Sequence, residues 1–169
     1  MVALLGEESS MTPVVAAARF VVPPRSPLDG VSPEAWVAYA RAMEVQPVWA
    51  VSASGGLGAY AMRPQRLVEL DVMRDGGLTR RGRRQVRRGE LLPAYADFLA
   101  NPRAQRAVFV RSNLLYDRAM ASGDLQRPVL LSRAGALAVL HRGGRGALAG
   151  WPDLFSDTRA LVEGVEGMF

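Results

Sequence analysis

Glu44 is the residue that the sequence best places for acid–base chemistry. It lies near the end of a stretch, 33–44, whose apolar residues recur at helical spacing, and the Gly-rich run Gly55-Gly56-Leu57-Gly58 follows it, with Tyr60 and Met62 beyond. A carboxylic acid that is fixed on a rigid helix and half buried can hold a proton for a leaving group. A backbone-rich loop that faces it provides a wall against which a sugar ring can lie. The pattern therefore favours a site that cleaves a glycan.

Other kinds of site are disfavoured by what the sequence lacks. The chain contains no Cys and a single His, His141. A thiolate zinc site and a cysteine nucleophile are thereby excluded, and a Ser-His-Asp triad or a multi-His metal site is improbable. Asp71 and Asp75 could supply a second carboxylate, but nothing in their spacing marks either as a catalytic acid.

Each candidate residue also has a purely structural interpretation. A lone Glu at a helix end is ordinarily a solvated surface charge. His141 comes before the pair Gly143-Gly144, where it would serve the carbonyls at a helix C-terminus. Tyr60 and Met62 would be part of the hydrophobic core.

The segment 38–64 resembles the lysozyme-like lytic transglycosylases, which include the goose-type lysozyme relatives. These proteins have a helix ending in Glu-Ser-Gly, then a stretch like Ala-Val-Ser-x-x-Gly-Ala-x-Gly-Leu-Met-Gln, with Met-Pro beyond. The chain follows this order with Ala50-Val51-Ser52, Gly55 to Gly58 and Met62-Arg63-Pro64, and Glu44 falls where the family has its catalytic Glu.

Two later blocks are similar to the same family. Gly135 to Gly146, followed by Trp151, looks like the later Ala-Tyr-Asn-Ala-Gly-x-Gly motif and is closer to an Ala-His-x-Gly-Gly version in phage-borne members. Phe98 to Gln105 is similar to the Phe-Leu-x-x-Pro-x-x-Gln start of the middle helix in those members. The resemblance runs from about residue 32 to residue 152.

The chain departs from the family at polar positions of the site. The Ser after the catalytic Glu is Val45 here, the Gln of the Gly-Leu-Met-Gln block is Ala61, and the Glu-Ser-Gly turn has become Glu44-Val45-Gln46-Pro47. In the family these groups hold the sugar and the loop around the acid. Each lost hydrogen bond to a substrate costs roughly 1–3 kcal/mol.

The resemblance implies a fold, a reaction and a set of site residues. The fold is expected to be mainly α, a lysozyme-like (α+β) helical domain with a small irregular or β segment around 50–62. The reaction is cleavage of the MurNAc–GlcNAc bond of peptidoglycan, with no metal and no cofactor. Glu44 would be the catalytic acid, and the glycan strand would contact Gly58, Tyr60, Met62, His141 and Gly143.

Several helices would position these residues. Ser32 caps and Pro33 begins the helix that ends near Glu44. Further helices are predicted from Pro64 through Leu70, from Asn101-Pro102 to near Gly123, from Ser132 to about Leu140, and from Asp157 to Val165. The helix that begins at Asn101-Pro102 would direct its apolar residues toward the core: Ala104, Ala107, Val108, Leu114, Leu115 and Ala119. The helix that begins at Ser132 would end at Gly143-Gly144. Trp36 and Trp151 are expected in the core.

Two segments stand outside this domain pattern in the 169-residue chain. Residues 1–31 predict an extended arm, with an apolar run from Val14 to Val22 that must be buried against the body, 32–169, or against a neighbour. Residues 74–89 form an Arg-rich strip, which is either a solvated loop or a contact for a polyanion. Its clustered members are Arg80, Arg81, Arg83, Arg84, Arg87 and Arg88.

Three functions are compatible with the composition, the resemblance and the Arg-rich strip. The net charge is +5, every basic residue is Arg, no stretch is apolar enough to span a membrane, and the N-terminus does not look like a signal peptide. We expect a peptidoglycan-cleaving enzyme, made in the host cytoplasm and carried by a phage tail or related particle, with tail or other virion proteins as partners of the arm. The alternative is a catalytically inactive lysozyme-fold component of such a particle. Nucleic-acid binding through the Arg-rich strip is the weakest interpretation.

Overall fold

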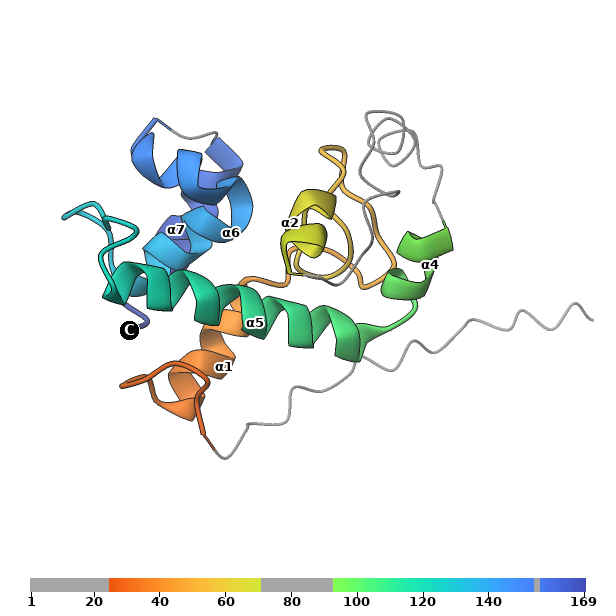
Figure 1. Cartoon of the computed structure of the whole chain (residues 1–169), viewed down its shortest axis with the longest axis horizontal. Coiled ribbons are helices and arrows are strands. Elements are labelled where there is room, and N and C mark those ends of the chain that lie inside the picture. The colour runs from red at the N-terminus through yellow and green to blue at the C-terminus, as the bar shows by residue number, and fades with distance from the viewer. Residues whose placement is uncertain (1–24, 71–92, 154–155) are drawn as a thin grey trace, which may run out of the picture.

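One long helix organises the shorter helices of the described chain (Figure 1). The computed structural model describes residues 25–70, 93–153 and 156–169, and this part is mainly helical, as predicted. Helix α5 (Pro102–Ala121) runs along the body. Helices α1 (Pro33–Ala42), α6 (Arg133–Ala149) and α7 (Ser156–Val165) lie toward its C-terminal end, and α2 (Pro64–Glu69) and α4 (Pro93–Leu99) lie toward its N-terminal end.

The helices begin where capping side chains satisfy free backbone N–H groups. The Ser32 hydroxyl accepts from the N–H of Ala35 at 3.1 Å, and the Asn101 side chain accepts from the N–H of Ala104 at 3.0 Å. Both helices then start with Pro, which has no N–H to lose at this position. The predicted starts of α1, α2 and α5 are confirmed.

Helix α6 consists of two helical segments that meet at Gly144. The first segment ends at the pair Gly143-Gly144, as predicted, and the second was not predicted. Gly144 has φ 73° and ψ −167°, a conformation that glycine adopts readily, and a further helical segment then continues to Ala149. The later part of α6 therefore brings Arg145 back alongside the body instead of releasing the chain into a loop.

The segment between α1 and α2 is compact and nearly devoid of regular strand. Isolated antiparallel bridges join Val51 to Leu57 and Leu57 to Met62, which agrees with the expected small irregular segment at 50–62. Leu57 and Met62 are both almost completely buried. This segment packs as part of the core and does not form a separate flap.

Aromatic rings connect the loop to the helices. Phe109 of α5 stacks on Tyr60 with ring centroids 4.2 Å apart and lies edge-on to His141 of α6 at 5.2 Å. Trp36 and Tyr39 of α1 pack against the same Phe109 at 5.8 and 6.0 Å. Trp36 is in the core, as expected, and Trp151 is partly buried against it.

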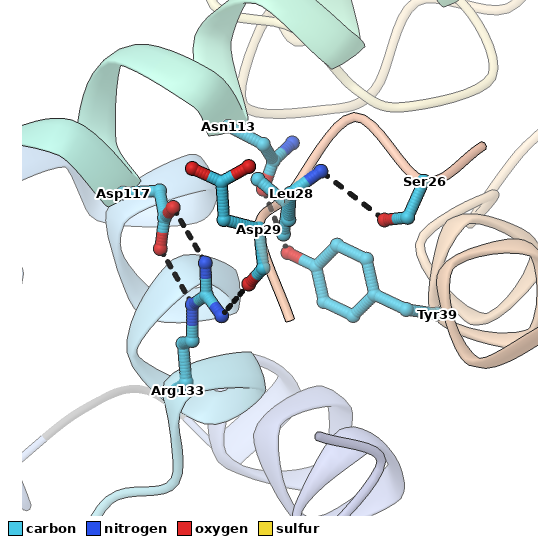
Figure 2. A network of polar contacts seen from close by, with 7 residues as sticks. All are labelled: Ser26, Leu28, Asp29, Tyr39, Asn113, Asp117 and Arg133. Carbon is cyan, nitrogen blue, oxygen red and sulfur yellow. Dashed lines mark hydrogen bonds and ion pairs between the residues drawn. The ribbon is translucent and has the colours of Figure 1, made fainter. Parts of the chain in front are cut away.

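The C-terminal end of α5 is joined to its neighbours by charged and polar groups. Arg133 of α6 pairs with both carboxylate oxygens of Asp117 and donates to the carbonyl of Asp29, and the hydroxyl of Tyr39 donates to Asn113 (Figure 2). Leu28, beside Asp29, is only 2% exposed. The described end of the expected arm, residues 25–31, thus packs on the body.

Two sequence predictions fall outside the described residues: the apolar run Val14 to Val22 and the Arg-rich strip 74–89. In the part of the chain that the structure describes, no helix is both long and apolar enough to cross a membrane.

Candidate functional site

Glu44 lies where the chain leaves α1, and its carboxylate is held by Tyr60. The Tyr60 hydroxyl donates to Oε1 of Glu44 at 3.1 Å. Within the described residues Oε2 has no hydrogen-bond partner, so this oxygen can exchange a proton with a bound ligand. The expected half-burial is wrong: Glu44 is exposed. Met43, the last residue before it, takes the buried position at the helix end, which leaves Glu44 on the solvent side.

Tyr60 is a fixed donor to this carboxylate. The residue is only 3% exposed, and its ring is clamped against Phe109 at an interplanar angle of 9°. Burial raises the pKa of the Tyr60 phenol, the negative charge of Glu44 raises it further, and Arg106 opposes the rise. The phenol therefore keeps its proton at every ordinary pH and donates it to Glu44.

Gln46 holds the Gly-rich loop from the α1 side. Its side-chain Nε2 donates to the carbonyls of Gly58 at 2.8 Å, Ala50 at 3.1 Å and Gly56 at 3.2 Å. The N–H of Val45 donates to the carbonyl of Ala59 at 2.9 Å. The two residues after Glu44 thus tie down the loop, Val45 through its backbone N–H and Gln46 through its side chain.

Gln105 holds the same loop from α5. Its Oε1 accepts from the N–H of Ala59 at 2.9 Å, and its Nε2 lies within hydrogen-bond distance of the carbonyls of Val48, Phe98 and Leu99. The residue is 1% exposed. A buried amide can satisfy this many partners only if the loop stays in one conformation, so Gln105 is a positioning residue for the loop.

Two residues that were predicted to contact substrate, Met62 and Gly58, are used inside the fold. Met62 is 1% exposed, and its bridge to Leu57 directs it into the core. The N–H of Gly58 donates to Ala50, and its carbonyl accepts from Gln46. Gly58 has φ +68°, and a Cβ there would clash with Oε1 of Gln105. The close packing of the loop against Gln105 therefore requires glycine at this position.

His141 and Gly143 lie on the other side of Tyr60 from Glu44. His141 Nε2 is 2.6 Å from the Tyr60 carbonyl, whereas the Tyr60 hydroxyl contacts Glu44. Burial lowers the pKa of His141 to about 4. Both His141 and Gly143 line a pocket of about 420 Å³ that Glu44 does not line. The predicted residues therefore divide into a Glu44–Tyr60 pair and a His141–Gly143 pair, joined through Tyr60.

Two exposed apolar side chains follow Glu44 in the sequence, and the sequence interpretation did not assign either to the site. Val45 is 43% exposed and Trp49 is 56% exposed, which is unusual for Trp. Both precede the Gly-rich loop and lie close to Glu44 in the sequence. The sequence feature that could have identified Trp49 is its position between Pro47 and the Gly-rich loop, outside any helical periodicity. An exposed aromatic face is the type of surface on which sugar rings stack.

No group of three or more His, Asp or Glu residues in the described ranges is arranged to hold a metal ion. No protein-family model, curated protein or solved structure matches the chain.

Proposed function

We propose that the chain is a lysozyme-like domain that cleaves the glycan strands of peptidoglycan, with Glu44 as its acid and base, in a phage tail or a related particle. The observation that carries the proposal is the convergence of three separate sequence segments on the adjacent residues Ala59 and Tyr60. Tyr60 bonds to Glu44 of the first segment and to His141 of the last, and Gln105 of the middle segment holds the adjacent Ala59. These are the three segments that resemble the lytic transglycosylases.

A single carboxyl group is sufficient for this reaction. Protonated Glu44 gives its proton to the glycosidic oxygen between MurNAc and GlcNAc, and the C1–O bond breaks. The carboxylate then takes the proton from the C6 hydroxyl of the same MurNAc, whose oxygen bonds to C1 and closes an anhydro ring. Tyr60 would hold Oε1 throughout, which leaves Oε2 for both proton transfers. A polymer can reach Glu44 because the residue is exposed.

The decisive experiment is Glu44→Gln, measured as clearance of purified peptidoglycan. The amide keeps the shape of the side chain and can still accept from Tyr60, but it cannot release a proton. Activity is expected to fall to background with no change in melting temperature. The matched control is Glu163→Gln, an exposed Glu on α7, which should clear peptidoglycan like the wild type. Wild-type protein that clears no peptidoglycan between mildly acidic and neutral pH overturns the enzymatic proposal.

The products distinguish the proposed reaction from simple hydrolysis. Mass spectrometry of the released fragments should find anhydro-MurNAc ends, which are one water lighter than reducing ends. Reducing ends alone would mean that water, and not the C6 hydroxyl, attacks C1. That result would require a second group to activate water beside Glu44.

A second candidate is a catalytically inactive component of the same kind of particle. It is favoured by Ala61, which replaces the family's Gln with a buried methyl group, and by Val45, which replaces the Ser after the acid. In this case Glu44→Gln should leave particle assembly and infection unchanged. In the enzymatic case the same variant should assemble normally but lose penetration of the cell wall.

A further inference from the structure

The pocket behind Tyr60 is lined by residues from three helices and has the size of a small-ligand site. Its volume is about 420 Å³, within the usual range for pockets that bind small molecules. Arg66 and Glu69 come from α2, with Arg63 just before it; Tyr116 comes from α5, and His141 and Arg145 come from α6. The interruption of α6 at Gly144 is what places Arg145 at the rim.

The charges of the pocket favour an anion. Arg66 is already engaged: it pairs with Glu69 at 2.9 Å, donates to the hydroxyl of Ser112 and lies 4.1 Å over the Tyr116 ring. Arg63 and Arg145 are exposed, and neither guanidinium group has a hydrogen bond or ion pair within the described ranges. With one carboxylate against three guanidinium groups, two positive charges are left for a ligand.

The three guanidinium groups are near enough to act on one phenol. Burial raises the pKa of the Tyr116 hydroxyl and the negative charge of Glu69 raises it further, whereas the positive charges of Arg66, Arg145 and Arg63 oppose that rise. This agreement supports a shared positive field inside the pocket and not three independent surface charges.

His141 presents a hydrogen-bond acceptor that needs a donor, whereas the arginines are donors that need an acceptor. A carbonyl oxygen can only accept, so Nε2 of His141 must carry the proton that it gives to Tyr60. In the neutral ring Nδ1 is then an acceptor. This atom is buried and has no hydrogen-bond partner among the described residues, and His141 lines the pocket. A water or a ligand hydroxyl that reaches Nδ1 from the pocket would satisfy this acceptor.

We propose that this pocket binds a small hydroxylated acid, whose carboxylate or phosphate is held by Arg63 and Arg145 and whose hydroxyl donates to Nδ1 of His141. The proposal does not depend on glycan cleavage at Glu44. Guanidinium groups recognise both oxyanions, so the two sources share one chemistry. A neutral sugar has no oxyanion for the arginines to bind, and inorganic phosphate has no sugar hydroxyl to donate to Nδ1.

The test is calorimetric titration of the full chain with glucose 6-phosphate, glucuronate and glucose at low salt. At least one of the two acids should bind saturably, and glucose should bind about tenfold more weakly or not at all. The acid that binds identifies the oxyanion. Absence of saturable binding by both acids overturns the proposal, and so does glucose binding as tightly as the acids.

Charge-matched variants test the arginines. Arg63→Ala/Arg145→Ala should weaken binding of the acid about tenfold or more. Arg103→Ala/Arg118→Ala removes the same charge from exposed positions of α5 that do not line the pocket, and should bind like the wild type. Equal losses in both pairs would mean that only net charge matters, which would overturn the assignment to this pocket.

The His141 contact has its own test. His141→Gln keeps an amide N–H for the Tyr60 carbonyl but removes the ring acceptor, and should weaken glucose 6-phosphate binding without weakening inorganic phosphate binding. If this variant does not fold, the wild type supplies the same comparison. Glucose 6-phosphate must then bind more tightly than inorganic phosphate, and equal affinities would overturn the role given to Nδ1.

Discussion

The two ends of α5 hold their neighbours with different chemistry. At the N-terminal end, the buried neutral side chain of Gln105 bonds to the backbone of the loop beside Glu44. At the C-terminal end, the Arg133–Asp117 ion pair lies partly in solvent (Figure 2). Removing a buried neutral partner leaves polar backbone unpaired, whereas water can replace a partner of an exposed ion. The loop end should therefore depend strongly on single side chains, and the other end weakly.

The largest expected effect is that of Gln105→Leu. The apolar side chain fills the space but leaves the N–H of Ala59 and the carbonyls of Val48 and Leu99 without this partner. The Phe98 carbonyl loses one donor and keeps the N–H of Asn101. The free energy of unfolding should fall by about 4 kcal/mol, measured by urea denaturation. Gln65→Leu, on the exposed side of α2, is the control and should change it by less than about 0.5 kcal/mol. Similar losses in the two variants would mean that the cost does not come from the buried hydrogen bonds of Gln105.

The next effect is a dependence of stability on pH that comes from His141. Burial lowers its pKa to about 4 in the folded chain, against an ordinary value of 6.5 in the unfolded chain. Between these values the unfolded chain binds more protons, so the stability from this group is lost as pH falls from about 6.5 to about 4. The total is roughly 3 kcal/mol. It should be absent from His141→Gln when urea unfolding of both proteins is compared across this range, and parallel curves would contradict it.

Much of the helical frame could be predicted because caps and glycines act locally. Ser32 and Asn101 mark helix starts from their own side chains, without knowledge of the fold. The buried face of α5 was harder to predict. Leu115 was expected to face the core and is 42% exposed, whereas the polar Gln105 and Asn113 are buried. Hydrophobic periodicity cannot identify a buried polar residue whose partners come from distant segments.

The candidate site could be predicted in its members but not in its geometry. The sequence placed Glu44 and Tyr60 in one region, and the structure joins them by a hydrogen bond. It did not reveal the exposure of Glu44, because whether a residue at a helix end faces solvent depends on which neighbour fills the core. It also did not reveal that Met62 is core or that Arg145 returns beside Arg66, since both depend on where a turn directs the chain.

A smaller effect is expected at Gly58, where the loop touches Gln105. Gly58→Ala places a methyl group against the Gln105 amide and strains a left-handed backbone conformation of φ +68°. The free energy of unfolding should fall by about 2 kcal/mol. Gly123→Ala is the matched control, because Gly123 has φ +84° but nothing within 4 Å of the added Cβ. It should cost about 1 kcal/mol. Equal costs would mean that backbone strain alone, and not the contact with Gln105, requires glycine.

The smallest expected effect is at the other end of α5, in Asp117→Asn. The carboxylate receives two bonds of 2.6 Å from Arg133, which is the strong bidentate geometry, but the Arg133 side chain is 30% exposed. Solvent therefore screens the pair, and its loss should cost about 1 kcal/mol in urea denaturation at low salt. The difference from the wild type should shrink at about 1 M NaCl, where the screening length is roughly 3 Å. The cost of Gln105→Leu involves no ionic partner and should stay unchanged in the same salt. A loss in Asp117→Asn that is insensitive to salt, or as large as that in Gln105→Leu, would mean that the ion pair also leaves buried groups unpaired, and the two ends of α5 would then not differ in the way their exposure implies.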